Sequence, residues 1–81
     1  MTVVTLYGRP GCHLCEDALQ VLKRVRERRP FEFEEVDIEA DAGLLTRYLE
    51  RIPVVLIDGR ERFELFVDEH ALERALGPAV Q

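Results

Sequence analysis

With 81 residues, the chain is long enough for one small domain, and we expect residues 1–81 to form a single one. Hydrophobic residues make up 47% and charged residues 33%, a globular balance that excludes a disordered chain, and no apolar run approaches the roughly 20 residues of a membrane span. The net charge of −5 argues against nucleic acid as a partner, because binding phosphates requires a basic stripe.

The first segments of the chain predict a strand followed by a helix. Residues 2–7 form a β-branched and aromatic run that ends at Gly8, which is typical of a buried strand. From Cys12 to Arg28 the apolar residues recur at helical spacing, and Pro30 ends the helix. The apolar face of this helix comprises Leu14, Cys15, Ala18, Leu19, Val21, Leu22 and Val25.

A second strand and a second helix follow. Residues 31–38 place Phe31 and Phe33 on one side and acidic residues on the other, which predicts a strand at the edge of the sheet. Asp41 is a good cap for a helix that runs to about residue 50. Its expected apolar stripe comprises Leu44, Leu45, Tyr48 and Leu49.

The last third of the chain predicts a hairpin and a closing helix. Residues 53–58 and 60–66 read as two strands, joined at the strong turn signal Asp58-Gly59. Asp68 is placed to cap a helix over residues 69–76, which Gly77-Pro78 would end.

The predicted element order is therefore βαβαββα. The first two strands are joined by a helix and should be parallel, with a right-handed crossover, whereas the last two form an antiparallel hairpin. This predicts an α/β protein of the α+β sandwich kind, a four-stranded mixed sheet flanked by three helices.

Both cysteines lie at the junction between the first predicted strand and the first predicted helix. Cys12 and Cys15 are one helical turn apart, so they face the same side of the helix. One turn provides the Cα separation of about 4.4–6.8 Å that a disulfide needs. So short a ring constrains little of the unfolded chain, which favours a bond that is made and broken over a structural staple.

The two sulfur atoms should differ in reactivity. Cys12 at the helix start faces unpaired N–H groups and the positive end of the dipole, and thiols in such sites have pKa values of about 3.5–7.5 instead of about 8.5. Cys15 should be more buried, with a higher pKa. We therefore expect Cys12 to attack a substrate disulfide and Cys15 to resolve the mixed disulfide.

The residues around the pair leave alternatives open. Arg9 and His13 flank the nucleophile; either a protonated His13 stabilises the Cys12 thiolate, or it points to solvent. Pro10 would fix the approach of the loop, and Gly11 would let the backbone come close. A zinc site within one chain needs about four ligands, and only His13 and His70 accompany the cysteines, so we expect no metal. A plain core role for two small apolar side chains is the remaining alternative.

The stretches "LYGRPGCHLCEDA" and "RIPVVLIDG" resemble the glutaredoxin-like branch of the thioredoxin superfamily over nearly the whole chain. The resemblance implies a thioredoxin-like glutaredoxin fold with a cis Ile52-Pro53 bond opposite the cysteines. It also implies that the Ile52 backbone is free to pair with an extended substrate, glutathione included.

The sequence departs from the glutaredoxin pattern at two places. His-Leu stands between the cysteines instead of Pro-Tyr, and "RFELFVDEHAL" replaces the Gly-Gly segment of glutathione-binding members. Residues 64–67 would crowd the tripeptide there. Asp68 either matches the acidic residue near the glutamyl end of glutathione or caps the last helix.

Together these patterns predict a cytoplasmic, monomeric thiol–disulfide oxidoreductase that takes part in cell redox homeostasis. No signal peptide is evident, and cytoplasmic thiols are kept reduced, which favours a catalytic or metal-binding role for a close cysteine pair. We expect no tightly bound cofactor, a disulfide-bearing protein or glutathione as substrate, and glutathione or a thioredoxin-reductase-type flavoenzyme as reductant. Two rival hypotheses are an electron donor for one client, such as ribonucleotide reductase, and a module that holds a metal or iron–sulfur cluster between two chains.

Overall fold

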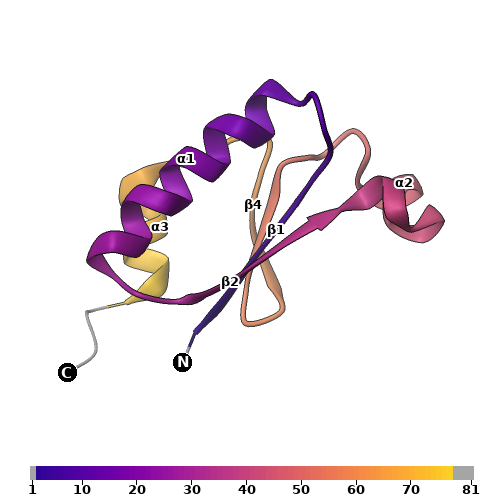
Figure 1. The fold of residues 1–81 in the computed structure, drawn as a ribbon. Helices are drawn as coiled ribbons and strands as arrows, with labels where there is room; N and C mark the ends of the chain where they lie inside the picture. Colours follow the sequence, from indigo (N-terminus) through magenta and orange to yellow (C-terminus); the bar gives the residue numbers. More distant parts are fainter. Residues whose placement is uncertain (1, 78–81) are drawn as a thin grey trace.

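The computed structural model describes residues 2–77 and confirms the predicted order of elements (Figure 1). Pro78, which was expected to help end the last helix, lies outside the described residues. The strands are β1 (Val3–Gly8), β2 (Glu32–Asp37), β3 (Val54–Ile57) and β4 (Arg60–Glu64). The helices are α1 (His13–Arg28), α2 (Ala42–Tyr48) and α3 (Glu69–Leu76), and a 3₁₀ turn, η1 (Ile38–Ala40), precedes α2.

The four strands form one mixed sheet in the order β2-β1-β3-β4. β1 runs parallel to β2 and antiparallel to β3, and β3 pairs with β4 through the hairpin. Asp58 and Gly59 both adopt positive φ, at 51° and 85°, as the predicted tight turn requires. The acidic strand β2 lies at an edge, as its sequence predicted.

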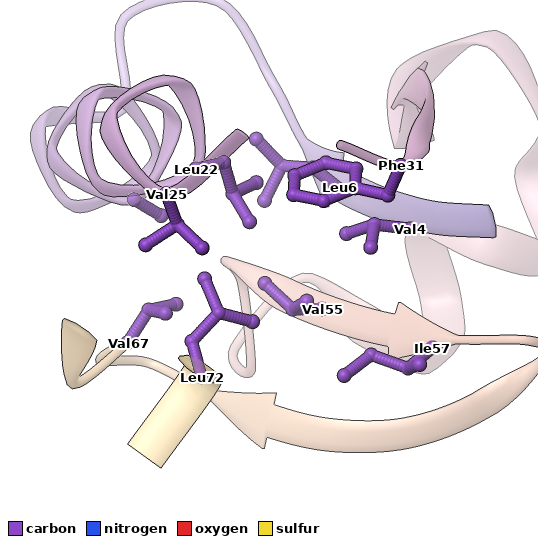
Figure 2. Packing of buried hydrophobic residues seen from close by; sticks show 10 residues of the cluster. Val4, Leu6, Leu22, Val25, Phe31, Val55, Ile57, Val67 and Leu72 are labelled. Carbon is purple, nitrogen blue, oxygen red and sulfur yellow. The ribbon is translucent and has the colours of Figure 1, made fainter. Parts of the chain in front are cut away.

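Alternation along the central strands divides the core between the two faces of the sheet. On one face, α1 and α3 cover Val4 and Leu6 of β1 and Val55 and Ile57 of β3 (Figure 2). Leu72 of α3 is fully buried in this cluster.

The opposite face carries a second cluster beneath α2. Val54 and Leu56 of β3 contact Ile38, Tyr48 and Cys15 there. Cys15 therefore belongs to the apolar cluster of the α2 face, although it is carried by α1.

Several side chains are more exposed than the sequence pattern predicted. Leu14 in the first turn of α1 and Leu49 at the end of α2 are 47% and 42% exposed, because neither packs over the sheet. The fourth strand ends at Glu64, two residues early, so Leu65 and Phe66 leave the sheet and are exposed.

Candidate functional site

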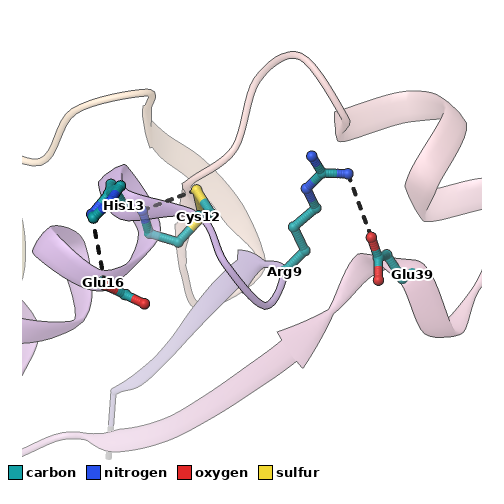
Figure 3. The surroundings of a disulfide bond; sticks show 6 residues. Arg9, Cys12, His13, Glu16 and Glu39 are labelled. Carbon is teal, nitrogen blue, oxygen red and sulfur yellow. Dashed lines mark hydrogen bonds and ion pairs between the residues drawn. A yellow bond between two sulfur atoms is a disulfide. The ribbon is translucent and has the colours of Figure 1, made fainter.

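The cysteine pair sits at the amino end of α1, where Cys12 caps the helix. Cys12 has extended backbone angles, and its Sγ accepts a hydrogen bond from the backbone N–H of Cys15 at 3.1 Å. The two residues form a disulfide with a Cα–Cα distance of 5.2 Å (Figure 3). The Cys12 sulfur thus meets one of the N–H groups that a helix start leaves without a partner.

Cys15 is more buried than Cys12, as predicted. Cys15 is buried, with 7% of its surface exposed, whereas Cys12 is half-buried. A substrate disulfide can approach Cys12, and Cys15 lies directly behind it.

Two glycines shape the loop that carries the pair. Gly11 has φ +80° and open space around it, so its role is the left-handed backbone and not the close approach that the sequence indicated. At Gly8, the last residue of β1, an added Cβ would lie 3.0 Å from Cys15 Sγ. The sequence predicts Gly8 only as the end of a strand, because its contact with Cys15 depends on tertiary packing.

The Ile52-Pro53 bond is cis, as the family resemblance implied. Ile52 packs in the same apolar cluster as Cys15, and Cys12 packs against that cluster. The segment that bears the cis bond therefore lies beside the cysteine pair.

The backbone of Ile52 is less free than expected. Its N–H already donates a hydrogen bond to the carbonyl of Tyr48 at 3.0 Å, because the last turn of α2 runs directly into this segment. Its carbonyl oxygen accepts no hydrogen bond from the residues that the structure describes. Of the two backbone polar groups of Ile52, the carbonyl is thus the one that is free to accept a hydrogen bond from an extended chain.

Arg9 and His13, the basic residues that flank the cysteine pair in the sequence, do not point toward the sulfur atoms. The His13 side chain is 98% exposed, and its Nδ1 lies 4.0 Å from a Glu16 carboxylate oxygen, so His13 points to solvent. The Arg9 guanidinium turns away from the sulfurs and pairs with Glu39 at 3.4 Å (Figure 3).

Asp68 acts as the cap of α3. Its carboxylate accepts the Ala71 N–H at 3.1 Å, and the next residue, Glu69, forms ion pairs with Arg24 and Arg28 in the second half of α1. The contacts of Asp68 thus stabilise its own helix, and a contact with substrate stays a prediction.

A shallow cleft of about 380 Å³ borders Cys15 on the side of β2. Three acidic residues, Glu16, Glu35 and Asp37, line it together with Arg9. Because Glu39 balances the charge of Arg9, the cleft carries an excess of negative charge.

A polar network fixes the far side of the site. The Tyr48 hydroxyl donates to Glu61 at 2.6 Å, and the Arg51 guanidinium binds both Glu61 and Glu64. Hydrogen bonds from Tyr48 and from Arg51 hold the pKa of Glu61 below its usual range, while the bond to Glu61 raises the pKa of Tyr48. The network ties α2 and the segment before the cis bond to β4.

Neither a metal centre nor a membrane span is evident in residues 2–77. Among these residues no three His, Cys, Asp or Glu side chains cluster as metal ligands. Nor is any helix in this part of the chain long and apolar enough to cross a bilayer.

Comparison with known proteins places the fold and the cysteine pair in a family. A sequence profile of the glutaredoxin-like domain (DUF836) matches residues 3–77. The chain belongs to this glutaredoxin-like family. A mycobacterial relative, uncharacterized protein Rv0508 of Mycobacterium tuberculosis, is 35% identical over 74 residues, which cover 85% of this chain and 76% of the relative.

Solved structures agree with the family assignment. Protein XcR50 from X. campestris is 36% identical with a TM-score of 0.77, and the match covers 90% of this chain and 93% of that one. Protein Ne2328 from Nitrosomonas europaea is 29% identical with a TM-score of 0.81, covering 94% and 92%. A thioredoxin from Halobacterium salinarum, 21% identical with a TM-score of 0.68 and covering 93% and 71%, shares the fold alone. The glutaredoxin-like protein thus has a thioredoxin-like fold with a disulfide-forming Cys-x-x-Cys pair.

Proposed function

We propose that this glutaredoxin-like protein is a dithiol thiol–disulfide oxidoreductase. One observation carries the proposal. The Cys12 sulfur caps α1 and accepts a hydrogen bond from the Cys15 N–H, and the Cys15 side chain is buried behind it. In the reduced protein we expect the same N–H to stabilise the Cys12 thiolate relative to the thiol.

The reaction moves two electrons from the thiol pair to the substrate. The Cys12 thiolate attacks one sulfur of the substrate disulfide, that disulfide breaks, and the departing thiolate takes a proton from water. Cys15 then loses its proton to solvent and attacks Cys12 Sγ, which releases the second substrate thiol and leaves the Cys12–Cys15 disulfide. An external thiol reductant, glutathione or a thioredoxin-reductase-type flavoenzyme, must then reduce this bond.

The experiment that tests the proposal traps the intermediate. Reduced Cys15→Ser protein, mixed with an excess of bis(2-hydroxyethyl) disulfide, should accumulate one mercaptoethanol adduct at Cys12 by mass spectrometry. The wild-type protein should instead proceed to the intramolecular disulfide and release two thiols. No adduct at Cys12 of the variant, or an adduct that persists equally in the wild type, would contradict the proposal.

The rival metal-binding module makes a different prediction. Two chains that share a metal or iron–sulfur cluster through their cysteines would hold one cluster per two chains and would protect the thiols from alkylation. Metal analysis and thiol titration of protein purified without oxygen distinguish this module from the oxidoreductase.

A further inference from the structure

Next to the segment that bears the cis Ile52-Pro53 bond, the chain makes a strained turn at Leu65. The Phe66 N–H donates to the Glu64 carbonyl at 2.7 Å, which closes a three-residue turn around Leu65, whose φ is +68°. Turns of this type with positive φ are rare and strained, because the Cβ atom of leucine clashes with the backbone there and glycine has no Cβ. The sequence nevertheless places Leu at this position.

The turn is fixed against the cis-proline segment. The Leu65 N–H donates to the Pro53 carbonyl at 2.8 Å and also lies 3.2 Å from the Arg51 carbonyl. Ile52, between these two residues, packs with Cys15. The turn is therefore separated from the thiol site only by the segment that bears the cis bond.

The turn presents large apolar side chains to solvent. Phe66 is 71% exposed and Leu65 is 45% exposed, whereas Val67, the next residue, is buried in the core. Leu14, between the two cysteines, is also exposed. Three of the four exposed large hydrophobic side chains in residues 2–77 thus lie on segments that adjoin the thiol site. Exposed apolar side chains near a reactive group indicate a surface that binds a partner.

The charge of the cleft on the other side of Cys15 indicates which class of substrate the site can bind. The cleft lined by Glu16, Glu35 and Asp37 has an excess of negative charge, since Arg9 is paired with Glu39. Glutathione carries two carboxylates and one ammonium group, and is repelled by such a cleft. A polypeptide with a basic residue beside its disulfide is attracted to it.

We propose that the Leu65–Phe66 turn docks the client, and that the client is a protein disulfide in an extended segment with an apolar and a basic neighbour. The apolar neighbour packs on Phe66 and Leu65, and the basic neighbour faces the acidic cleft. This inference rests on the proposed oxidoreductase function, and it names the substrate class of the same site. It assigns protein clients in preference to glutathione.

The test compares matched substrates on the full chain. Three short peptides, each with one cysteine linked to mercaptoethanol by a disulfide, carry Leu and Lys, Ser and Lys, or Leu and Glu beside that cysteine. Bis(2-hydroxyethyl) disulfide and glutathione disulfide serve as references. Acid-quenched mixing followed by mass spectrometry gives a rate constant for each.

We expect the Leu–Lys peptide to react about tenfold faster than either matched peptide and faster than glutathione disulfide. Phe66→Ser should reduce the Leu-over-Ser preference to less than about threefold, and Leu65→Gly should act in the same direction without loss of folding. Leu49→Ser, an equally exposed leucine away from the turn, is the matched control and should retain the preference.

The outcomes separate the two proposals. If the wild-type protein fails to reduce even bis(2-hydroxyethyl) disulfide, the oxidoreductase function itself is wrong. If it reduces that reference but shows equal rates for the matched peptides, or reacts fastest with glutathione disulfide, the docking surface is wrong and the function stands. A preference that survives both Phe66→Ser and Leu65→Gly also overturns the assignment.

Discussion

Gly8 ends β1 directly beneath Cys15, so close that an added Cβ would lie 3.0 Å from the Cys15 sulfur and 3.2 Å from its Cβ. Both contacts are tighter than ordinary van der Waals packing. The end of the strand therefore sets the position of Cys15, the resolving cysteine of the proposed mechanism, while the helix start sets that of Cys12.

Gly8→Ala should slow resolution more than the first attack. The new methyl group pushes the Cys15 side chain and misaligns its sulfur with Cys12, whereas Cys12 stays accessible. We expect the mixed disulfide to persist about tenfold longer than in the wild type when followed by quenched mass spectrometry. The rate of the first attack at Cys12 in the same variant is the control; equal lifetimes in wild type and Gly8→Ala would contradict this role.

Substitutions at Asp68 separate its capping role from a substrate role. Asn caps a helix as well as Asp does, so Asp68→Asn should keep stability, and Asp68→Ala should lose about 1 kcal/mol of unfolding free energy in urea. If the carboxylate only caps α3, both variants should reduce disulfides at the wild-type rate. A large rate loss in the stable Asp68→Asn variant would show that the charge contacts substrate.

Glu61 should make the protein less stable in acid. Its folded pKa is lowered by Tyr48 and then by Arg51, so the carboxylate contributes stability above its ordinary pKa of about 4.5, and that contribution is lost as pH falls through the lowered folded value. Glu61→Gln should therefore be less stable than wild type at pH 7, and the difference should shrink by pH 3.

Urea unfolding at the two pH values measures this difference. Glu50→Gln, at an exposed position with no ion pair in the described part of the chain, is the matched control and should show no such pH dependence. A Glu61→Gln penalty that stays constant from pH 7 to pH 3 would rule out the linkage.

Much of the fold follows from local patterns, because the apolar periodicities change from strand to helix at clear caps. Asp41 and Asp68 cap α2 and α3, and the Asp58-Gly59 turn forms the hairpin, as their residue types predict. Cys12 and Cys15 were predictable for the same reason, since the strand, the helix start and the spacing are all local signals.

The features that sequence missed depend on tertiary contacts. The alternating pattern after Arg60 continues through Phe66, yet β4 ends at Glu64 because the chain turns at Leu65, where φ is +68° and the Phe66 N–H donates to the Glu64 carbonyl. The Ile52 amide is occupied because α2 ends where Tyr48 can accept its hydrogen bond, and no local pattern fixes that position.

Leu65→Gly should increase stability while it removes the exposed leucine. Glycine adopts φ +68° without the steric cost, whereas it loses the contacts of the partly buried Leu65 side chain. We expect the steric gain to be the larger effect, so that the free energy of unfolding in urea increases by about 0.5–1 kcal/mol. Leu49→Gly is the matched control, because Leu49 has right-handed helical angles and glycine there should destabilise. A destabilised Leu65→Gly protein would show that the turn is not strained.

The proposed mechanism requires the start of α1 to hold the Cys12 sulfur as a thiolate near neutral pH. The direct test is the alkylation rate of the reduced Cys15→Ser protein with iodoacetamide from pH 4 to pH 10. We predict a single midpoint at least one pH unit below the value of about 8.5 for free cysteine. A midpoint at or above that value would show that the helix start does not stabilise the thiolate.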